Sequence, residues 1–385
     1  MIEALVDRTQ FPILATTNYL ASHSLGAVPA GAVGVLQQYA QTWATEGILA
    51  WEGDWWNEVW AFTASIERLL EAPPESVVPC LNVTLGFAAV ASALDYSDRP
   101  RVVISDLEFT TTLPFWRGQA GYGAEIVVIP SPDGICAPVA DMARAIDERT
   151  RLVVTSHAFF RSGALQDLAA LGARCREVGA YWLVDGYQSF GAVPFSVKEL
   201  QPDFAVGGCH KWLCGGPGGG FLFVRPELSR TLEPRLTGWF GLAEPFAYVK
   251  GPQGERPYPG VRRFLTGTPN VLGLYAAREG LRWVSEVGIE RIRKHSLALT
   301  ELVMAECDAR GFAVKTPRAP EKRNGMVCLD FPGASEVCRA LEEEKVLVDY
   351  RADCGIRVSP HFYNDESDLR GFFSALDRLC GGQTR

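Results

Sequence analysis

The sequence predicts an α/β protein, with a mostly parallel sheet wound with helices on both faces and a smaller α+β C-terminal domain. Three observations carry this prediction. Between residues 77 and 224, short apolar runs alternate with helical segments, which is the pattern of strands joined by crossover helices. These runs are apolar nearly throughout, as in strands covered on both faces. After residue 310 the strands and helices follow another order, which indicates a second domain.

The composition excludes several classes of protein. The chain has 385 residues, 47% hydrophobic and 21% charged, and a net charge of −8 without a basic block. We therefore expect no nucleic acid and no membrane as partner. The ten cysteines show no metal-ligand spacing, so we expect no metal site and reduced thiols in a cytoplasmic protein. We see no signal peptide and no run near the roughly 20 apolar residues that span a membrane.

The first 60 residues are expected to form an N-terminal arm and two helices. Gly26 and Pro29 punctuate the arm, and a helix should begin near Ala30. Residues 43–60 hold five of the ten tryptophans, and Trp56 and Trp60 are spaced for one helix face. We expect this cluster to form core or a subunit interface. A wall of the substrate pocket is the alternative.

The strands of the large sheet follow. A strand at 77–81 leads through a turn at 82–84 to a helix over 85–94. The Val83 N–H and the Thr84 hydroxyl at this helix start offer a phosphate site, because free N–H groups and the helix dipole attract anions. An ordinary N-cap by Asn82 or Thr84 is the alternative. Further strands are expected at 101–105, 124–130, 151–157, 181–186, 203–208 and 219–224, with helices through Trp116, near 138–148 and at 165–178.

The chain after Arg225 has another character. Residues 233–268 are rich in Pro and Gly and suggest a long functional loop or a domain junction. Helices are expected at 271–286, 289–310, 335–344 and from Asp365, and strands at 325–331, 346–351 and 356–360. We divide the chain into an N-terminal segment 1–30, a large domain 31–260 and a small domain 261–385, which the segment completes.

A lysine and an acid identify the chemistry. Asp185 and Lys211 each follow a predicted buried strand, so both can face one crevice of the sheet. An aldehyde cofactor with a basic ring nitrogen needs such a pair. The lysine forms a Schiff base with the aldehyde, and the carboxylate keeps the ring nitrogen protonated. Phe109, just past another strand, is placed to stack on a planar ring.

The ordered set of these features resembles the fold-type I pyridoxal-phosphate enzymes, within them the class V aminotransferase family, over nearly the whole chain. Five segments carry the resemblance. Residues 19–29 and 238–241 resemble the kynureninase-like branch, with His23 where that branch has Asn, and the other three resemble segments of the family. The five segments are YLASHSLGAVP (19–29), FRSGALQD (160–167), GWFG (238–241), TGTPN (266–270) and IRVSPHFYN (356–364).

The resemblance implies pyridoxal 5′-phosphate as cofactor and a role for each matching residue. Lys211 would carry the cofactor and act as base and acid at the substrate Cα, and Asp185 would hold the pyridinium charge. Arg357 would bind the substrate carboxylate bidentately. Other cofactor contacts would come from Val83, Thr84, Phe109, Gln188, His210, Trp239 and, from a second subunit of a homodimer with shared sites, Thr268. His23 and Ser24 would contact the substrate.

The predicted activity is kynureninase-like cleavage of the side chain of a small α-amino acid, by a hydrolase or lyase, through an external aldimine and loss of the Cα proton. A C–S lyase or cysteine desulfurase is one alternative, with Cys354 as the candidate nucleophile; we interpret Cys354 as a free thiol in a turn. An aminotransferase or epimerase of the same family, and a non-catalytic relative, are the others.

Overall fold

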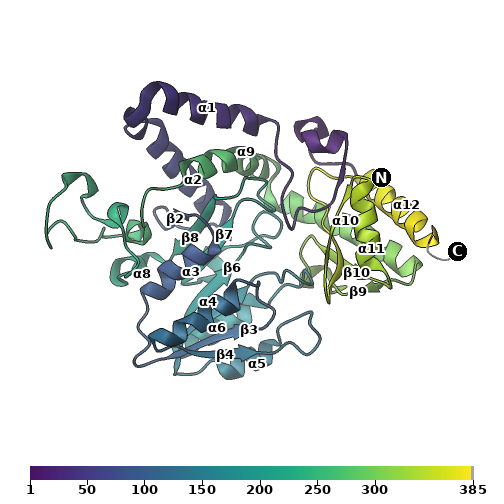
Figure 1. Cartoon of the computed structure of the whole chain (residues 1–385). Coiled ribbons are helices and arrows are strands. Elements are labelled where there is room, and N and C mark those ends of the chain that lie inside the picture. The colour runs from purple at the N-terminus through teal and green to yellow at the C-terminus, as the bar shows by residue number, and fades with distance from the viewer. Residues whose placement is uncertain (383–385) are drawn as a thin grey trace.

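The computed structural model describes residues 1–382. A large sheet flanked by helices forms one part of the molecule, and a smaller sheet with its own helices lies beside it near the C-terminus (Figure 1). The N-terminus lies next to the C-terminal part, although the chain between them builds the large sheet. Among residues 1–382, every helix is too short or too polar to cross a bilayer.

The large sheet has seven strands in the order β2-β8-β7-β6-β5-β3-β4. Only β8 runs antiparallel to its neighbours; the other pairings are parallel. The predicted mostly parallel sheet is therefore confirmed. The strands are Val77–Cys80 (β2), Arg101–Ser105 (β3), Glu125–Ile129 (β4), Thr150–Ser156 (β5), Tyr181–Asp185 (β6), Phe204–Gly208 (β7) and Gly220–Val224 (β8).

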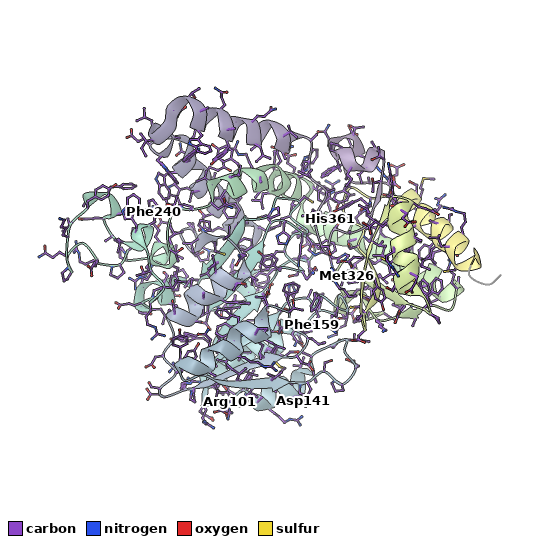
Figure 2. The ribbon with its side chains drawn as sticks, viewed as in Figure 1. Arg101, Asp141, Phe159, Phe240, Met326 and His361 are labelled. Atoms are coloured by element: carbon purple, nitrogen blue, oxygen red, sulfur yellow. The ribbon has the colours of Figure 1, made fainter. Side chains whose placement is uncertain are left out.

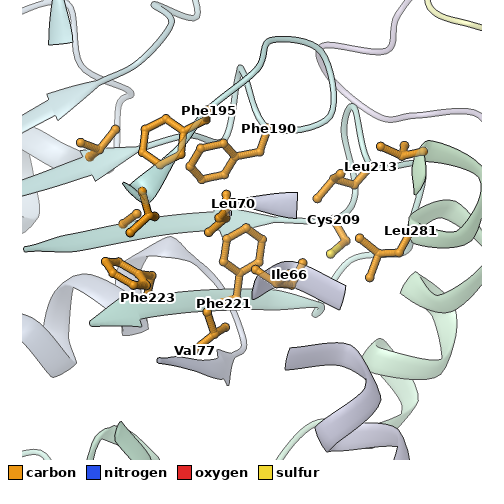
Figure 3. Close-up of a cluster of buried hydrophobic side chains, with 14 of the residues drawn as sticks. Ile66, Leu70, Val77, Phe190, Phe195, Cys209, Leu213, Phe221, Phe223 and Leu281 are labelled. Carbon is orange, nitrogen blue, oxygen red and sulfur yellow. The ribbon is translucent and has the colours of Figure 1, made fainter. Parts of the chain in front are cut away.

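Helices cover both faces of this sheet, because alternate residues of each strand point to opposite sides. Val102 and Ile104 pack with α3 (Val83–Ser92) and α4 (Thr112–Gly118). Val103 packs on the other face. The helices on that face are α2 (Asp54–Leu69), α6 (Leu168–Val178) and α9 (Val271–Val287). Figure 3 shows part of it, where Phe221 and Phe223 of β8 lie near Ile66 of α2 and Leu281 of α9.

Shorter elements complete the large part. Helix α1 lies along α9 (Figure 1). Residues 233–268 contain only short 3-10 turns, in agreement with the absence of a long periodic element there. These helices and turns are α1 (Gly31–Glu46), η3 (Gly47–Trp51), η4 (Gln119–Tyr122), α5 (Val139–Ala145), α7 (Val197–Leu200), α8 (Pro226–Thr231), η5 (Trp239–Gly241), η6 (Pro245–Ala247) and η7 (Val261–Phe264).

The small sheet is antiparallel, in the order β12-β13-β10-β9. The N-terminal strand β1 (Asn18–Tyr19) pairs in parallel with β11 (Val346–Leu347), so the first residues of the chain join its last ones. Division into domains at residues 30 and 260 stays a prediction. The remaining elements are α10 (Ile289–Ala309), β9 (Ala313–Val314), η8 (Pro320–Lys322), β10 (Val327–Asp330), α11 (Ala334–Glu343), β12 (Asp349–Arg351), β13 (Gly355–Val358) and α12 (Glu366–Gly382); η1 (Arg8–Gln10) and η2 (Pro12–Ala15) precede β1.

One boundary differs in a way that affects the site. Helix α3 begins at Val83, two residues before the expected start. The cause is Asn82, whose side-chain oxygen accepts the Leu85 N–H at 3.1 Å and caps the helix. Val83 and Thr84 therefore belong to the first helical turn, where backbone N–H groups have no partner inside the helix.

Candidate active site

A cavity of about 310 Å³ opens at the carboxyl edge of the large sheet. The parallel strands β2, β3, β6 and β7 all end at this edge, so the residues that follow them meet there although they lie far apart in sequence. The cavity is lined by Asn82, Val83, Thr84, Phe109, Thr111, Ser156, Ala158, Phe160, Asp185, Tyr187, Gln188, His210 and Lys211.

Lys211 projects its amine between two aromatic rings. The Nζ atom lies 5.2 Å from the ring centroid of Phe109 and 5.4 Å from that of Tyr187. Burial lowers the pKa of Lys211 to about 8, although the Asp185 carboxylate opposes the shift. A lysine with this pKa has a usable neutral fraction near pH 7, as a nucleophile or a base requires.

The turn that carries Lys211 is anchored on three sides. Cys209 and Leu213 insert into the hydrophobic cluster on one sheet face (Figure 3). His361 belongs to the C-terminal part of the chain (Figure 2). Its Nε2 donates to the Trp212 carbonyl at 2.7 Å. From the N-terminal segment, the Gly26 N–H donates to the His210 carbonyl at 2.8 Å.

Asp185 ends β6 and is almost fully buried. Its Oδ1 accepts the Tyr187 N–H at 2.9 Å. Burial raises the pKa of Asp185 to about 6, against the opposing effects of that N–H and of Lys211. A buried carboxylate of this kind gains by pairing with a cation, so its environment fits a protonated ring nitrogen.

Glu108, which the sequence analysis did not single out, is connected to Asp185 through Ser156 on the neighbouring strand. Its Oε2 accepts the backbone N–H and the hydroxyl of Ser156, at 2.9 and 2.5 Å, and Ser156 is the register partner of Asp185. Burial raises the pKa of Glu108 to about 8. Glu108 is thus mainly neutral at pH 7, and Asp185 is the more readily ionised of the two. The signal in the sequence was an acid directly before Phe109, three residues after the end of β3.

The start of α3 fits the phosphate end of the cofactor. Val83 and Thr84 line the cavity at the first helical turn, where N–H groups and the dipole favour an anion. His210 lines the same side, with its ring 5.5 Å from that of Tyr187. Burial, together with the Lys211 charge, lowers the pKa of His210 to about 4. Together these residues fit a phosphate.

Gln188 lines the cavity with its amide already in use. Its Nε2 donates to the His23 carbonyl at 3.1 Å, and its Oε1 accepts the Trp212 Nε1–H at 3.2 Å. One amide N–H remains for another acceptor. Gln188 therefore links the Lys211 turn to the N-terminal segment, and the remaining N–H is the group available to a cofactor oxygen.

The three predicted substrate residues meet at one carboxylate, Asp349. Arg357 donates two hydrogen bonds to this carboxylate, from Nε at 2.7 Å and from Nη2 at 2.5 Å. His23 Nε2 and Ser24 Oγ reach it at 2.9 and 2.6 Å. Arg357 also donates from Nη1 to the carbonyl of Phe160, which lines the cavity. Asp349 was missed from the sequence; its signal was its place opposite Arg357 in the hairpin β12–β13.

Two predicted cofactor residues lie outside this cavity. Trp239 packs on Phe240 and Tyr248, and its indole N–H donates to the Pro245 carbonyl. Thr268 is exposed. Both assignments stay predictions, and the one for Thr268 requires a second subunit.

The tryptophans of residues 43–60 are also absent from the cavity lining. Trp56 stacks on Trp60 with ring centroids 5.3 Å apart, and Trp51 and Trp55 pack edge to face.

Cys354 is buried, with its thiol donating to the Arg161 carbonyl at 2.7 Å. This contact agrees with a thiol held in a turn.

Comparison with known proteins places these residues in a family context. The model of the family described as aminotransferase class-V matches residues 19–372. An uncharacterized aminotransferase, YcbU of Bacillus subtilis, is 31% identical over 97% of this chain and 96% of its own length. Kynureninase of Pseudomonas fluorescens is 31% identical over 89% of this chain and 84% of its own.

Solved structures show the same fold at lower sequence identity. A cysteine desulfurase of Thermococcus onnurineus superposes with a TM-score of 0.87 at 22% identity, covering 97% of both chains. A variant of C-DES with glycine covalently linked to its PLP cofactor gives a TM-score of 0.87 at 22% identity, covering 96% of this chain and 99% of the other. The predicted fold is thus confirmed by similarity over nearly the full length.

Proposed function

This chain belongs to the aminotransferase class-V family, and we propose that it removes the α-proton of a small α-amino acid and cleaves the side chain, as a kynureninase-like hydrolase or lyase dependent on pyridoxal 5′-phosphate. The observation that carries the proposal is the position of the Lys211 amine. It lies buried in the cavity, between Phe109 and Tyr187 and within the electrostatic reach of Asp185 and Arg357.

The residues of the chain divide the work. Pyridoxal 5′-phosphate, when bound, supplies a ring that withdraws electrons from the substrate Cα. Asp185 holds the positive charge on the ring nitrogen, and the first turn of α3 holds the phosphate. Phe109 covers the ring. Lys211 is the nucleophile toward the aldehyde and, with its pKa near 8, the base that takes the α-proton. Arg357 orients the substrate carboxylate.

Transamination is the second candidate. One relative that matches almost the full length of both chains is named an uncharacterized aminotransferase, and transamination begins with loss of the same α-proton. A desulfurase has less support, because the Cys354 thiol is buried and engaged with a backbone carbonyl, whereas sulfur transfer needs an accessible thiolate. Side-chain cleavage is favoured by the similarity to kynureninase.

The proposal is tested on Lys211 first. Borohydride reduction of the purified protein with cofactor should attach the cofactor to the peptide containing Lys211, detected by mass spectrometry. Lys211→Ala should abolish the attachment and lower turnover by at least about 10³-fold. Lys198→Ala, which removes an exposed lysine, is the matched control and should change neither. Attachment elsewhere, or none in the wild type, would contradict the assignment.

Product analysis separates the two candidates. The protein is incubated with L-kynurenine and with a panel of small α-amino acids. Side-chain cleavage yields alanine or pyruvate together with the detached side chain, whereas transamination yields a keto acid that keeps its side chain. If the only products are keto acids that keep their side chains, the cleavage proposal is overturned and transamination remains.

A further inference from the structure

Asp349 accepts hydrogen bonds from all three residues that are predicted to contact the substrate, Arg357, His23 and Ser24. Oδ1 accepts from Arg357 Nε at 2.7 Å and from His23 Nε2 at 2.9 Å. Oδ2 accepts from Arg357 Nη2 at 2.5 Å and from Ser24 Oγ at 2.6 Å, and Arg351 Nη2 lies 3.1 Å away. A carboxylate has about four acceptor positions, so donors occupy all those of Asp349.

His23 contributes as a neutral ring. It is fully buried, and this burial, with the charge of Arg357, lowers the pKa of His23 to about 4. Hydrogen bonds from His23 and Arg357, together with the charge of Arg357, outweigh the burial of Asp349 and hold the pKa of this carboxyl far below its ordinary value. The ionised Asp349 only accepts, so His23 donates from Nε2. Its Nδ1 then accepts the Ser359 hydroxyl at 2.5 Å.

The guanidinium of Arg357 keeps part of its donor capacity. Of its five N–H groups, three make short hydrogen bonds: two to Asp349 and one, from Nη1, to the Phe160 carbonyl at 2.8 Å. The second N–H of Nη2 makes only a 3.4 Å contact with Ser24 Oγ, near the limit for a hydrogen bond. One N–H on each Nη atom is therefore available to another acceptor.

A substrate carboxylate could meet Arg357 by displacing Asp349 or by joining it. Displacement would leave the donors of His23 and Ser24 without their acceptor, and leaving the fully buried His23 donor unpaired would lower the affinity by roughly 5- to 150-fold. Joining breaks only the long Ser24 contact. The donor count therefore favours a carboxylate that binds while Asp349 stays in place.

We propose that Asp349 is a positioning residue that holds Arg357 by its Nε–Nη2 edge and thereby presents the two remaining Nη N–H groups to the substrate carboxylate. The inference rests on the proposed function, since it needs an α-amino acid in the site. Because Asp349 neutralises Arg357, recognition depends on the direction of these N–H groups more than on net charge. The same contacts couple the carboxylate site to His23 and Ser24 of the N-terminal segment.

The test compares two ligands in holoenzyme variants. L-Alanine and ethylamine differ by the carboxylate, and the change in cofactor absorbance gives a dissociation constant for each. Asp349→Asn should reduce the preference for L-alanine by roughly 10- to 100-fold, as expected for lost hydrogen bonds to a charged group, with little effect on ethylamine. Asp353→Asn removes a carboxylate that is 87% exposed on the same hairpin and should leave the preference unchanged.

Hydrogen–deuterium exchange of the cofactor-free protein supplies a second readout. Asp349→Asn should increase exchange in residues 22–25, and Asp353→Asn should not. Unchanged exchange would contradict the coupling to the N-terminal segment. Should Asp349→Asn fail to fold, Ser24→Ala removes one donor to Asp349, and we expect it to lower the preference for L-alanine by roughly 3- to 10-fold.

The other outcomes are distinct. Tighter L-alanine binding by Asp349→Asn would mean that Asp349 competes for Arg357, and equal loss of both ligands would mean a purely structural role; either overturns the inference. An unchanged preference in both variants would overturn it as well, while the proposed function stands. If neither ligand changes the cofactor absorbance of the wild-type protein, the proposed function itself is contradicted.

Discussion

At the scale of single residues, two buried carboxyl groups at one sheet edge have different environments. Glu108 accepts both donors of Ser156, and burial raises its pKa to about 8. Asp185 accepts the Tyr187 N–H and faces Lys211, and its pKa is about 6. When two acids have pKa values pushed apart, their roles separate. Asp185 is the one suited to hold a cationic ring.

Matched amide substitutions test this division. Asp185→Asn should weaken cofactor binding by at least about 100-fold, because removing one partner of a buried charge pair costs about 3–5 kcal/mol. Glu108→Gln copies the neutral form that prevails at pH 7 and should change cofactor affinity less than about 5-fold. Titration of the cofactor-free variants, followed by absorbance, gives both values. Equal losses in the two variants would contradict the division.

The raised pKa of Glu108 also gives a pH dependence with a defined sign. The folded protein keeps the Glu108 proton up to about pH 8, whereas the unfolded chain releases it near pH 4.3. Wild-type stability due to this group therefore falls as pH rises between these values. Glu108→Gln avoids that loss, so its advantage in urea unfolding should grow from pH 5 to 8, to the order of 3 kcal/mol. The exposed Glu148→Gln is the control.

At the scale of elements, the N-terminal segment and the Lys211 turn fit together through Gly26. A Cβ at Gly26 would lie 2.2 Å from the Lys211 carbonyl oxygen and 2.9 Å from the Cα of Cys214. The segment needs this approach because the Gly26 N–H donates to the His210 carbonyl. The N-terminal segment thus helps to hold the position of Lys211.

Gly26→Ala should lower the free energy of unfolding by about 1–3 kcal/mol, the usual effect of overpacking, and should slow the reaction of Lys211 with the cofactor. Gly118→Ala is the matched control. No atom lies within 4 Å of a Cβ at Gly118, which ends α4 with helical backbone angles, so alanine should stabilise the protein by about 0.5–1 kcal/mol. Thermal unfolding measures both. A Gly26→Ala protein as stable as the wild type would show that the segment can move away without cost.

At the scale of the whole molecule, α1 and η3 expose several large apolar side chains. Residues 31–45 contain no charged side chain, and Val33, Trp43, Ile48 and Leu49 are exposed. Large apolar side chains exposed on adjoining elements are a feature of interaction sites. They agree with the proposed homodimer, in which Thr268 of one subunit would serve the other's phosphate site.

We therefore predict a particle of twice the 42.1 kDa chain mass in sedimentation experiments. Replacing both Ile48 and Leu49 by Asp should raise the dimer dissociation constant by at least about 100-fold, as expected for apolar anchors. Tyr122→Asp, at an exposed aromatic residue in η4, should not. Thr268→Ala should weaken cofactor binding roughly 10-fold, and only where the wild type is dimeric. A wild-type monomer that binds cofactor at full affinity would reject the shared site.

Much of the fold and of the cofactor site could be predicted because the relevant signals are local. Several apolar runs are followed by polar or aromatic residues, and parallel strands bring these ends to one edge whatever the strand order. Val83, Thr84, Phe109, Asp185 and Lys211 were found in this way, the family resemblance added Gln188 and His210, and all seven line the cavity. The start of α3 was misplaced because the sequence left the N-cap open between Asn82 and Thr84, and only the hydrogen bond of the Asn82 side chain decides between them.

The sequence alone determined the family, the α/β fold and pyridoxal phosphate as cofactor, since these depend on residue types in order along the chain. Only the tertiary structure decided which side chains became partners. It paired Arg357 with Asp349, set Glu108 on Ser156 and buried the Cys354 thiol against a carbonyl. The physical reason is that hairpin pairing and strand order choose the neighbours, and burial among those neighbours sets the charge of each group.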